Sequence, residues 1–334
     1  GVASERFGDK ILLVFGLAMS GIGYLLFSFA GGSTTVLICL IIVGVGTAFQ
    51  HVPSSALISR AYADSGRRGA LGLYNSSGDA GKLIFTTSFS LAIGAGLAWS
   101  WPTVAFGLAA VLSAAVVFFA LQSRRQAAAF AAQQSSENPE AEAAGKWGIL
   151  DRQSFSALLA VVALDSMVQA AVLTFTAFLM LEKGVPLYIA TFAATAILIG
   201  GMFGKALCGF LADRIGVRTA FSIVQLLTGA LIVLALLVPG GWAFGVLPFL
   251  GIVLQGSTSI TYSMVNDFVH PSRVSRGFAL IYAAGSFASV AGPLSFGLIG
   301  DRYGIETAMV VMAAIAVLAI PPCLYLRLGR VPVE

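Results

Sequence analysis

The sequence predicts an all-α membrane protein built from two related helical bundles. Three observations support this fold class. Apolar residues make up 58% of the 334 residues and charged residues only 10%, against roughly 25% charged in an average soluble domain. The apolar residues gather in ten long runs, and the second half of the chain repeats the first. So much apolar surface cannot be hidden in one aqueous core, which indicates that lipid is the solvent.

Each of the ten runs approaches or exceeds the roughly 20 apolar residues that a membrane-spanning helix needs. We therefore expect helices at residues 11–30, 35–58, 70–95, 102–122, 154–181, 187–208, 219–239, 242–266, 276–300 and 305–327.

The repeat has an offset of 208 residues without a gap, and its clearest part is a short motif rich in glycine and charge. The paired positions are Gly1 with Gly209, Glu5 with Asp213, Arg6 with Arg214, Gly8 with Gly216 and Lys10 with Arg218. Two apolar runs precede the second copy, at 154–181 and 187–208, and none precedes the first. We therefore expect that two helices are missing before Gly1 and that the chain is partial.

The basic residues lie in alternate connections between the apolar runs. The connections near 31–34, 96–101 and 240–241 contain no Lys or Arg, whereas the intervening ones contain nearly all of them. Basic connections of membrane proteins face the cytoplasm. We therefore expect the basic loops and the C-terminus to be cytoplasmic, and we expect membrane lipid rather than nucleic acid as the surrounding partner, although the pI is about 9.1.

The pattern of apolar runs is interrupted between residues 123 and 152. This segment is rich in Ala, Gln, Ser and Glu and has no apolar face to bury, as is typical of a linker. We predict an N-terminal bundle at 1–122, a cytoplasmic linker at 123–152 and a C-terminal bundle at 153–334.

Two helical halves joined by a linker, each with a copy of the motif G-x-x-x-(D/E)-R-x-G-x-(R/K), resemble the major facilitator superfamily. The resemblance covers the whole chain and implies that ten of twelve transmembrane helices, the third to the twelfth, are present. It also implies alternating access around a site between the halves at mid-membrane. The motif residues would then form a cytoplasmic gate: Gly1, Glu5, Arg6, Gly8, Lys10, Gly209, Asp213, Arg214, Gly216 and Arg218.

Charged residues inside the run at 70–95 are the strongest functional signal. Asn75, Asp79 and Lys82 are spaced four and three residues apart, so they share one helix face, with Tyr74 beside them. At about 1.5 Å per residue from Ala70, Asp79 and Lys82 lie roughly 13 to 18 Å deep. Charges at this depth usually face a cavity and serve function. The alternative is an intrahelical ion pair that serves packing.

Two further polar stripes are candidates for substrate or proton binding. Asp165 has Gln169 on its helix face, and desolvation favours the protonated form of a carboxylic acid, which suits proton coupling. The second stripe could equally make hydrogen bonds between helices. It consists of Gln255, Thr258, Tyr262 and Asn266.

Three further polar residues lie within the apolar runs at 35–58 and 187–208. Gln50 and His51 lie in the run at 35–58, where His51 could relay a proton or contact substrate, or could simply pack. Lys205 precedes Gly209 by one turn, and we expect its side chain to extend to the cytoplasmic interface.

Departures from the family's patterns weaken one subclass, the drug–proton antiporters. These usually carry an Arg four residues before a Gly-x-Gly, and here Leu40 precedes Gly44-Val45-Gly46. They also tend to have a Gly-Pro where this chain has Gly81-Lys82, and its Gly-Pro occurs instead at Gly292-Pro293.

The sequence contains no P-loop, HExxH or Cys-His cluster, so we expect neither an enzyme nor a cofactor or metal. We predict a secondary transporter for a small organic anion, coupled to protons, in a bacterial inner membrane. Lys82 would hold the anion, and Asp79 or Asp165 would carry the proton. The alternatives are a drug or metabolite efflux antiporter and a membrane sensor or scaffold that does not transport. From the resemblance alone we expect a monomer.

Overall fold

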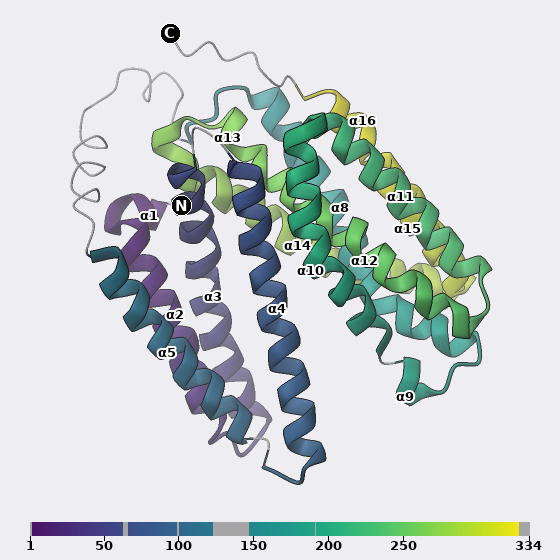
Figure 1. The fold of residues 1–334 in the computed structure, drawn as a ribbon, viewed down its shortest axis with the longest axis horizontal. Coiled ribbons are helices and arrows are strands. Elements are labelled where there is room, and N and C mark those ends of the chain that lie inside the picture. The colour runs from purple at the N-terminus through teal and green to yellow at the C-terminus, as the bar shows by residue number, and fades with distance from the viewer. Residues whose placement is uncertain (1, 63–65, 99, 123–146, 191, 327–334) are drawn as a thin grey trace. The chain divides into compact units, whose positions relative to one another are not determined.

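The computed structural model describes residues 2–62, 66–98, 100–122, 147–190 and 192–326 as helices joined by short connections (Figure 1). All ten predicted helices are present. The long helices are α2 (Asp9–Phe27), α3 (Ser33–Ala61), α4 (Arg67–Gly94), α5 (Ser100–Gln122), α8 (Arg152–Glu182), α10 (Phe192–Ile215), α11 (Val217–Leu237), α12 (Gly240–Ser263), α14 (Val274–Tyr303) and α15 (Ile305–Leu318). Shorter helices are α1 (Val2–Phe7), α9 (Leu187–Ala190), α13 (Val265–Phe268), α16 (Ile320–Leu324) and a 3₁₀ turn at Pro271–Arg273.

Within the described residues, nine helical segments are long and apolar enough to cross a membrane. Helix α4 is long enough but not among them, because Arg67, Arg68, Asn75, Asp79 and Lys82 interrupt its apolar run. The least apolar of the ten long helices is therefore also the one that carries the predicted buried charges.

Three predicted helix boundaries differ from the structure. The run at 187–208 forms the short α9 followed by α10, which continues to Ile215 because no proline occurs before Gly216. The run at 242–266 ends as α12 at Ser263 and resumes as α13. The run at 305–327 is divided at Ala319 between α15 and α16, where Pro321 and Pro322 lack the amide protons that a continuous helix requires.

The chain forms two compact units, and helices α4 and α14 contribute residues to both. Unit 1 comprises Gly1–Ala61, Ile84–Gly148 and His270–Ala279. Inside it, α2 packs against α3 and α5 (Figure 1). A methyl group at Gly16 would lie 2.7 Å from the carbonyl oxygen of Gly46, so glycine is what lets α2 and α3 approach closely.

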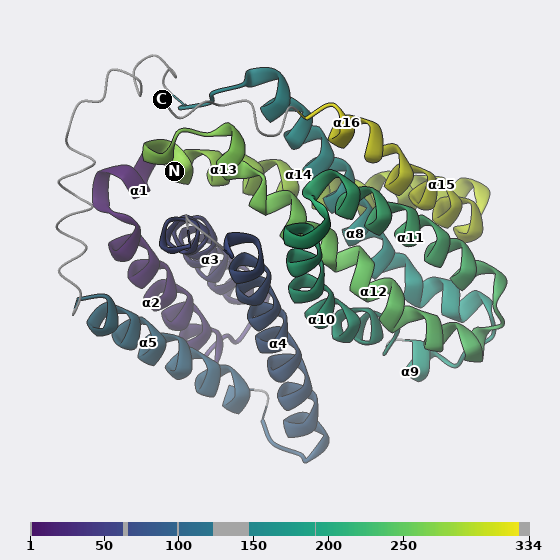
Figure 2. The same cartoon turned by 45° about the horizontal axis from the view of Figure 1, so that its top comes forward.

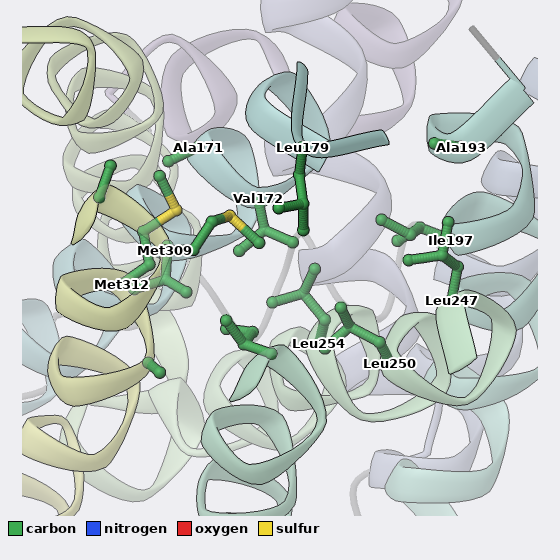
Figure 3. Close-up of a cluster of buried hydrophobic side chains, with 14 of the residues drawn as sticks. Ala171, Val172, Leu179, Ala193, Ile197, Leu247, Leu250, Leu254, Met309 and Met312 are labelled. Atoms are coloured by element: carbon green, nitrogen blue, oxygen red, sulfur yellow. The ribbon is translucent and has the colours of Figure 1, made fainter. Parts of the chain in front are cut away.

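Unit 2 comprises Tyr62–Leu83, Ile149–Val269 and Leu280–Glu334. Its apolar core lies among α8, α10, α11, α12, α14 and α15. Figure 3 shows side chains of this core, including Met309 and Met312 of α15 and Leu250 and Leu254 of α12. These four residues are at most 1% exposed, so this part of unit 2 is closely packed.

Helices α10 and α12 pack closely against each other in unit 2, and they lie side by side in Figure 2. Methyl groups at Gly200 and Gly204 of α10 would overlap the carbonyl oxygens of Pro248 and Ile252. A methyl group at Gly251 of α12 would overlap the carbonyl oxygen of Ile197. Backbone contact of this kind is what small residues provide between helices in lipid.

The two copies of the repeated motif end at glycines with the same backbone conformation. Gly8 has φ 84° and ψ 143°, and Gly216 has φ 85° and ψ 149°. Gly304, which follows the sequence Asp301-Arg302-Tyr303 at the end of α14, has φ 88° and ψ 156°. This region of φ and ψ is essentially restricted to glycine. All three glycines lie between the end of one helix and the start of the next.

Candidate functional site

Unit 2 contains a cavity of about 410 Å³ among α4, α8, α10, α12 and α14. This volume is in the range of small-molecule sites in proteins. Every lining residue except one glycine has a polar side chain. The lining residues are Lys82, Ser166, Gln169, Lys205, Gln255, Thr258, Tyr262, Tyr282, Gly285, Ser286 and Ser289.

Glycines place the first half of α4 directly against α10. A methyl group at Gly72 would lie 2.5 Å from the carbonyl oxygen of Lys205, and one at Gly209 would lie 2.8 Å from that of Arg68. Arg68 of α4 contacts Gly209 of α10, and Gly72, further along α4, contacts the earlier Lys205. The two helices are therefore antiparallel here. Close contact therefore brings the middle of α4 within reach of side chains from α10.

Asp79 of α4 lies between two lysines. Its Oδ1 is 2.9 Å from Nζ of Lys82, one turn further along the same helix, and its Oδ2 is 2.6 Å from Nζ of Lys205 on α10. Asp79 is 2% exposed, whereas the side chains of Lys82 and Lys205 are 66% and 10% exposed. Each carboxylate oxygen thus has its own ammonium group, and both ammonium groups belong to residues that line the cavity.

The expectation that Lys205 extends to the cytoplasmic interface was wrong. Side chains of an α-helix lean toward its N-terminus. Lys205 therefore leans away from Gly209 and the end of α10, and toward Asp79, which is deeper along the antiparallel α4. A buried ammonium group needs a counter-ion, and Asp79 provides it.

Asp165 of α8 lies in a second polar cluster formed by uncharged donors. Its Oδ1 accepts hydrogen bonds from Nε2 of Gln225 at 2.7 Å and Oγ of Ser257 at 2.8 Å. Its Oδ2 accepts one from Nε2 of Gln169 at 2.8 Å. Within the described part of the chain, no Lys, Arg or His lies within ion-pair distance of this carboxylate.

Gln169 connects this cluster to the cavity. Its Nε2 also lies 2.9 Å from Oγ1 of Thr258, and both residues line the cavity, whereas Asp165 does not. Asp165 is 4% exposed. The carboxylate therefore lies behind the cavity wall and fixes the amide of Gln169, which forms part of that wall.

The structure brings some of the sequence-predicted residues together and leaves others apart. Lys82, Gln169, Gln255, Thr258 and Tyr262 line the cavity, and Asp79 and Asp165 contact lining residues. Tyr74 lies near enough to Tyr262 to interact electrostatically. Asn75 and Asn266 are half-buried in unit 2 outside the lining set.

Gln50 and His51 belong to unit 1 and are not cavity residues. Gln50 donates hydrogen bonds to the carbonyl oxygen of Gly16 at 3.1 Å and to Oγ of Ser20 at 2.8 Å. It therefore joins α2 to α3. His51 is exposed on α3.

The second copy of the repeated motif takes part in ion pairs at one end of unit 2. Asp213 accepts a hydrogen bond from Arg68 at 3.3 Å and another from the amide of Gly69 at 3.3 Å. Arg67 pairs with Asp267 at 3.0 Å. These contacts join the first turn of α4 to α10 and α13. Of the other residues in this copy, Arg214 is exposed and Arg218 donates to the carbonyl oxygen of Leu326.

The first copy of the motif is less completely described. Gly1 and the side chain of Glu5 lie outside the described residues. Arg6 is exposed and stacks on Phe7, and Nζ of Lys10 lies 4.7 Å from the ring centre of Phe118. Asp9, within the same segment, pairs with Arg60 and accepts a hydrogen bond from Ser275 at 3.1 Å.

Sequence reasoning missed several residues of the site. Lys205 was recognised but assigned to the wrong environment. Gln225, in the apolar run at 219–239, could have been found, because an amide at mid-membrane depth needs a partner. Ser166, Ser286 and Ser289 gave no usable signal, since serines are common between membrane helices.

Comparison with known proteins agrees with the fold. The model of the Major Facilitator Superfamily matches residues 1–206 and 158–334. The uncharacterized MFS-type transporter YfnC of Bacillus subtilis (strain 168) is 26% identical over 317 residues, which cover 92% of this chain and 75% of that protein.

Two solved structures show a similar fold at low sequence identity. The E. coli fucose:proton symporter FucP superposes with a TM-score of 0.75 at 14% identity, over 97% of this chain and 85% of FucP. The human organic anion transporter MFSD10 superposes with a TM-score of 0.73 at 16% identity, over 96% of this chain and 78% of MFSD10.

Proposed function

The chain belongs to the major facilitator superfamily, which consists of transporters rather than enzymes, and we propose that it is a secondary active transporter of a small organic anion coupled to protons. It is an integral membrane protein, as its helices and its family indicate. The observation that supports an anionic substrate is that two lysines, Lys82 and Lys205, line one cavity among the helices of unit 2.

Electrostatics favours an anion over a cation in this cavity. Lys82 and Lys205 each carry a positive charge and Asp79 one negative charge, so this group has a net charge of +1 when all three are ionised. A buried charge, such as that of Lys205, attracts a ligand more strongly than the same charge in water. A cationic drug would meet net repulsion, which disfavours cation efflux, the second candidate.

Two carboxylates are candidates for the coupling proton. Protonation of Asp79 would remove the counter-ion of two cavity lysines. Protonation of Asp165 would instead rearrange the hydrogen bonds of Gln169 in the cavity wall. Both changes would alter how the cavity receives an anion, and transport by variants of each residue distinguishes them.

We place the protein in the cytoplasmic membrane of a bacterium, with the segment 123–152 and the C-terminus in the cytoplasm. The arginine- and lysine-rich connections support this orientation. The relative from Bacillus subtilis supports the bacterial assignment.

The test of the proposed function measures internal pH in liposomes that contain the protein, while organic anions, neutral solutes and cationic drugs are added outside in turn. We expect anions to acidify the interior in wild type. Lys82→Ala should slow this flux, and Arg302→Ala, which removes an exposed cation outside the cavity, should not. Asp79→Asn and Asp165→Asn show which carboxylate the proton flux requires.

Other results would contradict the proposal. Flux with cationic drugs but not with anions would indicate an efflux antiporter. No flux with any solute, in a protein that elutes as a folded species, would indicate a sensor or scaffold.

A further inference from the structure

The arrangement of Asp79 between two lysines points to a more specific account of the site, which rests on the proposed function. We propose that the substrate is a hydroxylated carboxylate whose carboxylate group takes the place of Asp79 between Lys82 and Lys205, and that Asp79 carries the coupling proton.

The first argument is the geometry of the two lysines. Their ammonium groups hold the two oxygens of one carboxylate, at 2.9 Å for Lys82 and 2.6 Å for Lys205. The pair is therefore already arranged as a carboxylate receptor. Asp79 occupies that receptor as an internal substitute, and both lysines line the cavity from which a soluble carboxylate would approach.

The second argument concerns the rest of the cavity wall. Apart from the lysines and Gly285, each lining residue carries a hydroxyl or an amide. Among them are Gln255, Thr258, Tyr262 and Tyr282. A wall of this composition would leave polar groups unpaired against a lipophilic solute, which is costly. It suits a solute with several hydroxyl groups, and the volume of about 410 Å³ accommodates one of about six carbons.

The third argument is linkage between the anion and the proton. An anion that neutralises the lysines removes the attraction that keeps Asp79 ionised, and protonation of Asp79 releases the lysines for the anion. Binding of one therefore favours binding of the other, by the same factor in both directions. This reciprocity couples the substrate to a proton without any further group.

The charged and titratable groups around Asp79 are consistent with this role. The charges that act on it are Lys82 of its own helix and Lys205 of α10. Among the described residues, the other titratable groups near the cavity are Tyr262 of α12 with Tyr74 of α4 beside it, Tyr282 of α14, and Asp165 of α8 behind Gln169. Binding of an anion to Lys205 and Lys82 therefore changes how readily Asp79 takes up a proton.

The test is calorimetric binding of gluconate, a hydroxylated carboxylate of six carbons, to the purified full chain at several pH values between about 5.5 and 8. In wild type the affinity should fall with rising pH, by at most about tenfold per pH unit, the limit for one linked proton. In Asp79→Asn the affinity should be high and independent of pH, because asparagine neither competes for the lysines nor titrates. Asp165→Asn should keep the pH dependence.

Control ligands separate the parts of the proposal. Sorbitol has the hydroxyl groups without the charge, and acetate has the charge without the hydroxyl groups, so each should bind at least about tenfold more weakly than gluconate. Glucose 6-phosphate tests whether a phosphate serves equally well. Binding of glucose 6-phosphate without gluconate would overturn the carboxylate assignment.

Three outcomes would overturn the proposal while leaving the proposed function intact, provided that organic anions still drive proton flux in liposomes. The first is the absence of gluconate binding at any pH in wild type and Asp79→Asn. The second is a pH dependence that persists in Asp79→Asn. The third is tighter binding of acetate than of gluconate. Failure of the proposed function would appear instead as a lack of flux with every anion.

Discussion

Replacing Lys205 with glutamine should stop anion-driven proton flux almost completely, with a fall in initial rate of about 100-fold or more. Such a fall corresponds to about 3 kcal/mol, within the range for removing one partner of a buried charge pair. Lys205 is 10% exposed and lies 2.6 Å from Asp79, so the change removes a desolvated positive charge from the cavity wall. Lys82→Gln should slow flux only about two- to fivefold, because its side chain is 66% exposed. Internal pH in liposomes measures both rates.

A second variant shows whether Lys205→Gln merely prevents folding. The double variant Asp79→Asn with Lys205→Gln removes both members of the buried pair, so that Asp79 is not left with the more exposed Lys82 as its remaining cation. It should fold better than Lys205→Gln in thermal unfolding and still fail to transport. A Lys205→Gln protein that transports at the wild-type rate would show that Lys205 does not take part in anion binding.

Replacing Gly251 with alanine should cause a large loss of stability through helix packing alone. The new methyl group would overlap the carbonyl oxygen of Ile197, so α10 and α12 would have to separate. Overpacking of this kind costs about 1–3 kcal/mol, and between membrane helices close packing is a main source of association. Thermal unfolding of the purified protein in detergent measures the loss.

Gly245 provides a matched control on the same helix. It is exposed, and a methyl group there would meet no atom within 4 Å. Gly245→Ala should therefore unfold at the wild-type temperature or slightly above it, because alanine favours helix more than glycine does. Equal unfolding temperatures for the two variants would contradict the packing account.

The fold was largely predictable from the sequence because its strongest determinants are local. A run of apolar residues must form a helix in lipid, since each backbone amide and carbonyl needs a partner within the segment. The ten helices followed from this rule. The ends of the helices were less predictable. Prolines divide the last apolar run near Pro321, and α10 continues past the end of its apolar run to Ile215.

The candidate site was predictable in part. Spacing along α4 placed Asp79 and Lys82 on one face, and the structure shows them as an ion pair. The partner on α10 was not predictable, because it depends on how closely two helices approach. Gly72 and Gly209 allow that approach, and the direction in which Lys205 leans then decides its partner. Neither follows from hydropathy.

The proposed site has a consequence for the charge that transport moves. The empty cavity group, with Lys82, Lys205 and Asp79 all ionised, has a net charge of +1. With Asp79 protonated and a monocarboxylate bound, the group again has a net charge of +1. One proton and one monoanion cross together, so a complete cycle should move no net charge across the membrane.

The most direct test of this account is the steady-state accumulation of labelled gluconate in liposomes, with the pH gradient and the membrane potential set independently. We predict that accumulation follows the pH gradient, about tenfold per pH unit for one proton per monoanion. A potential set by potassium and valinomycin at equal pH should leave the inside and outside concentrations equal. Accumulation that follows the potential, or that ignores the pH gradient, would contradict electroneutral transport of a carboxylate with a proton.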